Sequence, residues 1–209
     1  MFDTHQQIDA VDRQVGSRLL DDQQEAATVI IAQTLPADIA SVWEECTNAE
    51  RIPRWFLPIS GDLEPGGQFQ LEGNAGGTIE ACDPPQGFDA TWEFDGGVSW
   101  IELRLDAVDE QQTRLQLTHI VPIDDHWEKY GPGATGVGWD GALGGLATYL
   151  RSGEPVDQQE AMEWMGSEEA QQFYVRCSEL WGDAHIGAGE DETTAREAAE
   201  RTAEFYTGA

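Results

Sequence analysis

The first clearly patterned part of the chain is an apolar run that leads into a helical pattern. Residues 26–35 are β-branched and apolar over the length of a strand, and Pro36 ends the strand while suiting the first turn of a helix. In residues 36–47 apolar side chains recur every three or four positions, which predicts a helix with one apolar face, and a second short helix is predicted at 51–56. The 25 residues before this run carry only weak signals and receive no assignment.

From residue 58 to 121 the pattern changes to short segments that Gly, Asp and Pro interrupt at nearly regular intervals. Apolar and polar side chains alternate most clearly in the last three segments, as expected for strands with one covered face and one solvated face. This pattern is typical of an antiparallel meander. The predicted strands are 67–71, 77–82, 87–94, 98–108 and 113–121.

The remainder of the chain reads as helical. A glycine-rich loop at 131–138 is followed by an apolar stripe at helical spacing in 139–150, which predicts a helix that covers the sheet. Three glycines in this helix, Gly141, Gly144 and Gly145, indicate close approach of another segment, because glycine is costly inside a helix. Two further helices are predicted at 157–187 and 190–206.

This order of elements, a strand, two helices, a run of antiparallel strands and a long helix, predicts an α+β fold. Several spaced motifs also resemble bacterial relatives of the activator of the ninety-kilodalton heat-shock chaperone's ATPase, within the START, polyketide cyclase and plant-allergen (SRPBCC) superfamily. The motifs lie at residues 35–56, 61–67, 82–85 before Trp92, 113–119 and 136–140.

The resemblance spans about residues 26–150 and implies the helix-grip fold, a curved antiparallel sheet wrapped around a long helix, with extra C-terminal helices. It also implies a cavity between sheet and helix that holds apolar molecules in this superfamily. We therefore expect an N-terminal extension at 1–25, a helix-grip domain at 26–151 and a C-terminal helical extension at 152–209, packed on the domain.

The composition of the chain narrows the classes of molecule that it is expected to bind. The chain of 209 residues has 40 acidic and 11 basic side chains, a net charge of −29, so nucleic acid and anionic membranes are poor partners. Its three cysteines lie far apart, which argues against a disulfide framework, and no His or Cys spacing indicates a metal site or a cofactor. With no signal peptide or membrane span in the sequence, we expect a cytoplasmic protein, monomeric or homodimeric.

His119 shares a strand face with Leu117, so its imidazole is placed to meet a ligand or act as a base, or else to be a satisfied core histidine. Asp140 is the second catalytic candidate, with an alternative role as an anion favoured by a helix N-terminus. The remaining lining residues expected for an apolar cavity, with indole N–H groups as orienting donors, are Trp55, Trp92, Phe94, Leu103, Trp139 and Leu143. Trp100, on the opposite strand face, is expected outside.

The function expected from these features is binding of a hydrophobic or aromatic small molecule without covalent change. Two alternatives stay open at this point. One is a cyclase, dehydrase or hydrolase that uses His119, and the other is a chaperone cofactor or interaction protein, which the family resemblance alone suggests.

Overall fold

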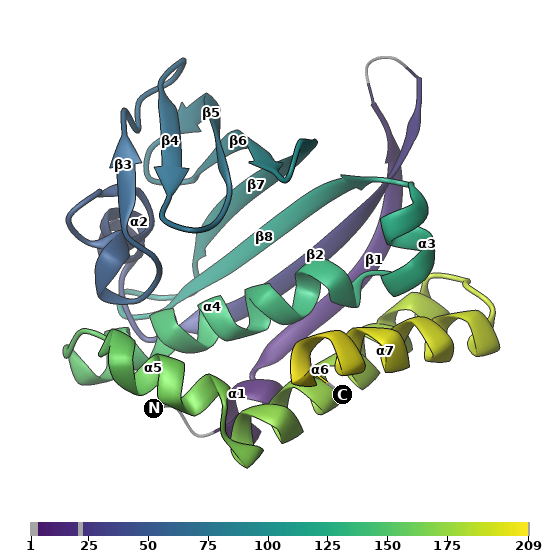
Figure 1. Ribbon diagram of the computed structural model, residues 1–209. Helices are drawn as coiled ribbons and strands as arrows, with labels where there is room; N and C mark the ends of the chain where they lie inside the picture. The colour runs from purple at the N-terminus through teal and green to yellow at the C-terminus, as the bar shows by residue number, and fades with distance from the viewer. Residues whose placement is uncertain (1–3, 21–22, 209) are drawn as a thin grey trace. The chain divides into compact units, whose positions relative to one another are not determined.

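The structure is a computed structural model, which describes residues 4–20 and 23–208. Within these ranges the chain forms an eight-stranded sheet, with helices before the first strand, between the second and third strands and after the last, which confirms the predicted α+β class (Figure 1). The strands are β1 (Val11–Leu19), β2 (Glu25–Leu35), β3 (Ile59–Gly61), β4 (Gln68–Leu71), β5 (Gly76–Asp83), β6 (Gly87–Phe94), β7 (Gly97–Ala107) and β8 (Thr113–Pro122). Their order across the sheet is β1-β2-β8-β7-β6-β5-β4-β3.

The helices are α1 (Thr4–Asp9), α2 (Ile39–Thr47), the 3-10 helix η1 (Ile52–Arg54), α3 (Asp125–Tyr130), α4 (Gly133–Ser152), α5 (Gln158–Met165), α6 (Glu168–Gly187) and α7 (Glu192–Thr207). None of the helices in the described ranges combines the length and the apolar character that crossing a bilayer requires.

Contacts divide the chain into two compact units made of interleaved segments. The first unit contains residues 1–31, 120–144 and 157–209, and the second contains residues 32–119 and 145–156. Strands β2 and β8 and helix α4 each contribute residues to both units. The three regions predicted from the sequence follow continuous stretches of chain, and their boundaries stay a prediction.

In the first unit, α1 and β1 occupy the stretch for which the sequence carried only weak signals. Both elements pack against α6. The strand pattern of β1 is obscured because Arg13 stands at a position where its side chain is only 6% exposed. A buried arginine looks like a surface residue in a hydropathy pattern unless its partner is known.

The predicted glycine-rich loop at 131–138 is wrong, because α4 already begins at Gly133. Its glycines serve packing within the first unit. A Cβ atom added at Gly136 would lie 2.2 Å from Cε2 of Trp181, a fully buried side chain of α6. The loss of helix propensity at glycine is therefore offset by close contact with a large indole.

The second unit holds the meander, whose predicted strands are confirmed with bounds that differ by at most two residues. Helix α2 begins where Asp38 accepts a hydrogen bond from the amide N of Ser41 at 3.0 Å, so the helix starts later than Pro36 suggested. Close approach is confirmed at Gly145, where an added Cβ would lie 2.5 Å from the carbonyl oxygen of Trp55, and is wrong at Gly141, which has open space.

The predicted helix at 157–187 is two helices, because Gly166 ends α5 and Ser167 caps α6 by accepting from the amide N of Ala170 at 3.2 Å. Helix α7 ends at Gly208, whose φ of 72° suits glycine. Helices α6 and α7 pack along each other, and α3 contacts α7, all within the first unit.

Candidate functional site

A row of side chains crosses the meander of the second unit on one sheet face. Phe69 on β4 pairs with Gly77 on β5, and Trp92 on β6 pairs with Ser99 on β7. The register that pairs Gly76 with Glu93 and Ile79 with Ala90 sets Gly77 beside Trp92. His119 on β8 completes the row, since its Nε2 lies 2.8 Å from Ser99 Oγ. We call Phe69, Gly77, Trp92, Ser99 and His119 the aromatic row.

The glycine in the row lets two rings approach each other. A Cβ atom at Gly77 would lie 3.0 Å from Cε1 of Phe69 and still closer to the carbonyl oxygen of Thr91 on the neighbouring strand, so no other residue fits. The Phe69 ring lies 6.4 Å from the Trp92 ring, and the Trp92 ring meets His119 edge-on at 6.0 Å between centroids. These distances are those of interacting aromatic pairs.

Burial changes along the row in a way that leaves one ring accessible. Phe69 is 8% exposed and His119 2% exposed, whereas Trp92 is half-buried. Leu103 on β7 and Leu117 on β8, both buried, share the face of the row because they lie at even spacing from Ser99 and His119. An apolar surface with one partly accessible indole is suited to an aromatic ligand.

The hydrogen bonds around Ser99 fix the direction of the contact with His119. The Ser99 hydroxyl donates to the carbonyl oxygen of Trp92 at 3.0 Å, and a hydroxyl has only one proton. Ser99 Oγ therefore accepts from His119, whose Nε2 carries the proton. Burial lowers the pKa of His119 to about 4, so the imidazole is neutral at neutral pH.

This arrangement differs from that of a serine nucleophile. An activated serine donates its proton to the histidine, whereas here the histidine donates to the serine. In addition, a base with a pKa near 4 accepts a proton weakly at pH 7. The hydrogen bond between His119 and Ser99 therefore has a structural role.

A second polar group in the same unit surrounds Trp55. The Trp55 indole Nε1 donates to the carbonyl oxygen of Glu45 at 2.9 Å, so this N–H is used within the protein and does not serve as the expected orienting donor. The Trp55 ring stacks with Phe56 at 5.5 Å between centroids. The Glu45 carboxylate accepts from Arg51 Nη1 at 3.2 Å.

Phe94 is not covered as a lining residue would be. It is the last residue of β6, directly before a turn in which Asp95 and Gly96 have φ angles of 49° and 80°, and its side chain is 58% exposed. Although alternation puts Phe94 on the Trp92 face, the sheet ends there. Trp100, expected outside, pairs with Thr91 on the other face and is half-buried.

The remaining predicted residues lie on α4 in the first unit, where Trp139 is half-buried and Leu143 is buried. Asp140 follows Trp139 and does not lie at a helix start, since α4 begins seven residues earlier at Gly133. Asp140 is instead an inner residue of the helix that is 1% exposed. Its interpretation as an anion at a helix N-terminus is therefore wrong.

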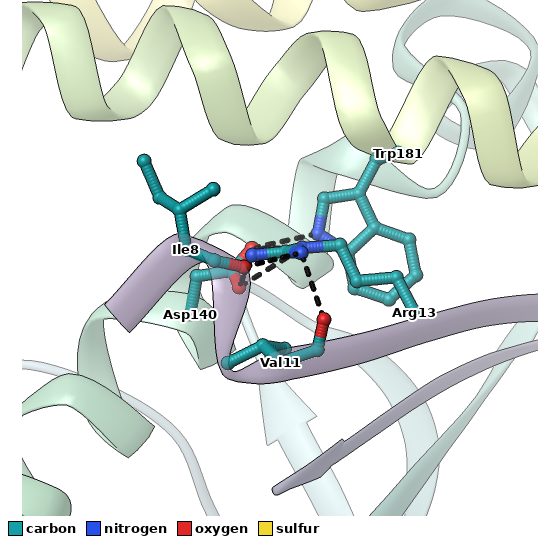
Figure 2. Close-up of polar contacts among 5 residues, drawn as sticks. All are labelled: Ile8, Val11, Arg13, Asp140 and Trp181. Carbon is teal, nitrogen blue, oxygen red and sulfur yellow. Dashed lines mark hydrogen bonds and ion pairs between the residues drawn. The ribbon is translucent and has the colours of Figure 1, made fainter. Parts of the chain in front are cut away.

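Asp140 is held by an ion pair and an indole (Figure 2). Its Oδ1 accepts from Arg13 Nη2 at 2.7 Å, and its Oδ2 accepts from Trp181 Nε1 at 2.9 Å. Arg13 Nη1 also donates to the carbonyl oxygens of Ile8 and Val11 at 3.2 and 3.1 Å. Both carboxylate oxygens are engaged, so the group joins β1, α4 and α6 as a structural element.

Two functional candidates escaped the sequence analysis. Ser99 precedes Ile101 by two residues, so strand alternation places it on the face of His119, and this signal was present in the pattern. Glu45 gave no comparable signal, because a glutamate beside Glu44 on an amphipathic helix has the pattern of a solvated residue.

Comparison with known proteins gives one family and several similar folds. The family described as activator of Hsp90 ATPase homolog 1-like protein matches residues 36–151. CalU16 from Micromonospora echinospora is 32% identical; its solution structure has a TM-score of 0.73 and covers 86% of this chain and 97% of its own. The crystal structure of CalU16 has a TM-score of 0.69, with coverage of 84% and 98%.

Two further solved structures share the fold at lower identity. DynU16, a protein of the dynemicin biosynthetic locus, is 22% identical with a TM-score of 0.54 and covers 61% of this chain and 48% of its own. EF2215 from Enterococcus faecalis is 12% identical with a TM-score of 0.60, and coverage is 90% and 96%. No curated protein matches the sequence. These likenesses confirm the predicted helix-grip fold.

Proposed function

Because this chain belongs to the family of activator of Hsp90 ATPase homolog 1-like proteins, we propose that it binds an apolar, aromatic small molecule and releases it unchanged. The family fits either ligand binding or cyclase-type chemistry, so the choice depends on the residues of this chain. The observation that carries the proposal is the aromatic row, in which a half-buried indole lies between a phenylalanine and a neutral histidine.

Trp92 is the contact residue of this proposal. Its ring is the only half-buried side chain among the three rings of the row, and its neighbours Phe69 and His119 are each at least nine-tenths buried. A planar ligand laid against Trp92 gains apolar contact without first separating the other two rings. Aromatic pairs of this kind contribute about 0.5–1.5 kcal/mol beyond the area they bury.

The state of His119 favours binding over catalysis. A general base needs a pKa near the working pH and a free path to the proton it removes. In this chain His119 donates from Nε2 to Ser99 and has a pKa of about 4. The neutral His119 side chain completes the aromatic row without adding charge to it, which suits an apolar ligand.

The test is a fluorescence titration of the full chain with N-phenyl-1-naphthylamine, a neutral apolar probe, in parallel with thermal unfolding. The matched variants are Trp92→Ala and Trp100→Ala, one tryptophan on each sheet face. Saturable binding is expected, with affinity reduced about tenfold in Trp92→Ala, because a contact of roughly 1.4 kcal/mol corresponds to a factor of ten. Trp100→Ala should change affinity less than about twofold.

Absence of saturable binding, or equal losses in the two variants, would overturn the proposal. Native mass spectrometry of the protein purified from its own host then separates carriage from catalysis. A carrier retains a bound small molecule whose mass is the same before and after prolonged incubation with the protein, whereas an enzyme converts it.

A further inference from the structure

Phe94 continues the aromatic row toward the end of the sheet. It lies two residues after Trp92 on β6, so the two side chains project from the same face of the strand. Trp92 is half-buried, whereas Phe94 is 58% exposed. The second unit therefore carries two neighbouring aromatic side chains on one sheet face, both of which solvent reaches.

The residues beside these two side chains on the adjoining strands are small. Phe94 pairs with Gly97 on β7. Trp92 lies between Ser99 on β7 and Gly77 on β5. Directly opposite side chains on paired strands normally contact each other, but a glycine has no side chain with which to cover its neighbour. The small neighbours thus leave accessible surface on both aromatic residues.

The backbone holds Phe94 in place although its ring is exposed. Asp95 and Gly96 have φ angles of 49° and 80°, and positive φ at both central residues is the mark of a type I′ hairpin turn. The pairing of β6 with β7 continues up to this turn, since Phe94 still pairs with Gly97. A contact at Phe94 therefore requires little ordering of the chain on binding.

The spacing and the charges around Phe94 define the kind of molecule that would contact both rings. Alternate residues of a strand lie about 6.6 Å apart. One six-membered ring placed on Trp92 does not extend to Phe94, whereas three rings fused in line do. Phe94 follows Glu93 and precedes Asp95, and both carboxylates are exposed, so a negatively charged molecule would be repelled here.

Resting on the proposed function, we infer that Phe94 is a specificity-determining residue of the aromatic row, which takes an elongated molecule of fused aromatic rings without negative charge. One end of the molecule lies against Trp92, and the other end covers Phe94. Binding then removes from water the most exposed large apolar side chain described in the second unit, which stabilises the complex. A shorter molecule contacts Trp92 alone.

The experiment compares quinoline and acridine, which have two and three fused rings in line and one ring nitrogen each. Both are uncharged at mildly alkaline pH. Binding to the full chain is measured by calorimetry for wild type, Phe94→Ala and two controls. Phe205→Ala removes a phenylalanine that is 64% exposed on α7 of the first unit. Val98→Ala changes an exposed apolar residue of the same hairpin, on the other sheet face.

Phe94→Ala should weaken the binding of acridine about tenfold and that of quinoline less than about twofold, because only the longer molecule reaches this ring. Phe205→Ala and Val98→Ala should change either affinity less than about twofold. Phe94→Tyr, which keeps the aromatic ring, should retain the affinity for acridine. Trp92→Ala should weaken the binding of both molecules.

Equal effects of Phe94→Ala on the two molecules, or an unchanged affinity for acridine, would overturn the inference. The proposed function keeps its own test, because the binding of N-phenyl-1-naphthylamine should depend on Trp92 whether or not Phe94 takes part. Acridine that fails to bind while N-phenyl-1-naphthylamine binds also overturns the inference alone. If none of the three molecules binds saturably, both proposals fail.

A measurement on the wild-type chain is independent of any substitution. In NMR spectra of protein labelled in its phenylalanine rings, the Phe94 signals should shift on saturation with acridine and shift much less with quinoline. The Phe205 signals should stay in place with both. Phe94 signals that do not respond while acridine binds would contradict a contact at this ring.

Discussion

Acidification should destabilise this protein through His119. The imidazole is 2% exposed, and burial lowers its pKa to about 4 in the folded state. In the unfolded chain the ordinary histidine pKa of about 6.5 applies. Between these two values the unfolded state binds more protons than the folded state, so the free energy of unfolding is fully retained above pH 6.5 and falls as the pH drops toward 4.

The size of the effect follows from the two pKa values. Linkage gives a loss of about 2 kcal/mol at pH 5 and about 3 kcal/mol at pH 4, relative to neutral pH. Either loss is a large part of the stability of a typical domain, about 5–15 kcal/mol. The effect is separate from the titration of the 40 acidic side chains, which also changes stability over this range.

The assay is urea unfolding of wild type and His119→Gln at pH 7, 5 and 4. Glutamine does not titrate, and its amide can still donate to Ser99, so the carboxylate contributions cancel in the difference between the two proteins. That difference should move in favour of His119→Gln by about 2 kcal/mol from pH 7 to pH 5. A difference that stays constant within about 0.5 kcal/mol would refute a buried neutral imidazole.

Four further substitutions test the packing by urea unfolding. Asp140→Asn should cost about 3–5 kcal/mol, because it leaves the buried guanidinium of Arg13 without its counter-charge, and a change below about 1 kcal/mol would contradict this. Gly145→Ala should cost about 1–3 kcal/mol, since the new Cβ would lie 2.5 Å from a carbonyl oxygen. Gly141→Ala, in open space on the same helix, should instead stabilise by up to about 1 kcal/mol, and equal effects at the two glycines would be inconsistent with the packing. Ser99→Ala should cost about 1–3 kcal/mol by removing the acceptor of the buried histidine N–H; unchanged stability would argue against that bond.

The meander and the main helices could be predicted from the sequence because their signals are local. Alternation over 87–94 and 113–121 depends only on which face of a strand is covered, and the strands observed there match it. Alternation also placed Trp92 and His119 on faces that the structure brings together. Alternation shows which side chains share a face of one strand. Which of them lie side by side on neighbouring strands, as in the aromatic row, depends on the register between strands, which the sequence does not encode locally.

What the sequence could not predict depends on partners far along the chain. Arg13 is buried only because Asp140, 127 residues away, neutralises it, so β1 escaped detection. Asp140 was expected at a helix start because the glycines before it carry no helical signal, whereas α4 begins at Gly133. Phe94 lies on the sheet face that the alternation predicted. Its side chain is exposed because the sheet ends there, and an alternating pattern does not show where a sheet ends.

Two buried carboxylates among the described residues, Asp140 and Glu45, differ in how completely hydrogen bonds within the protein engage them. Asp140 has donors on both oxygens, so its removal should lower stability and leave the binding of N-phenyl-1-naphthylamine by the folded protein unchanged. Glu45 has a donor on Oε1, while its Oε2 is buried without one among the described residues. Replacing Glu45 by methionine removes an uncompensated polar atom, so stability should stay level or rise. A loss of stability in Glu45→Met as large as that in Asp140→Asn would mean that the contact with Arg51 holds Glu45 as firmly as Arg13 holds Asp140.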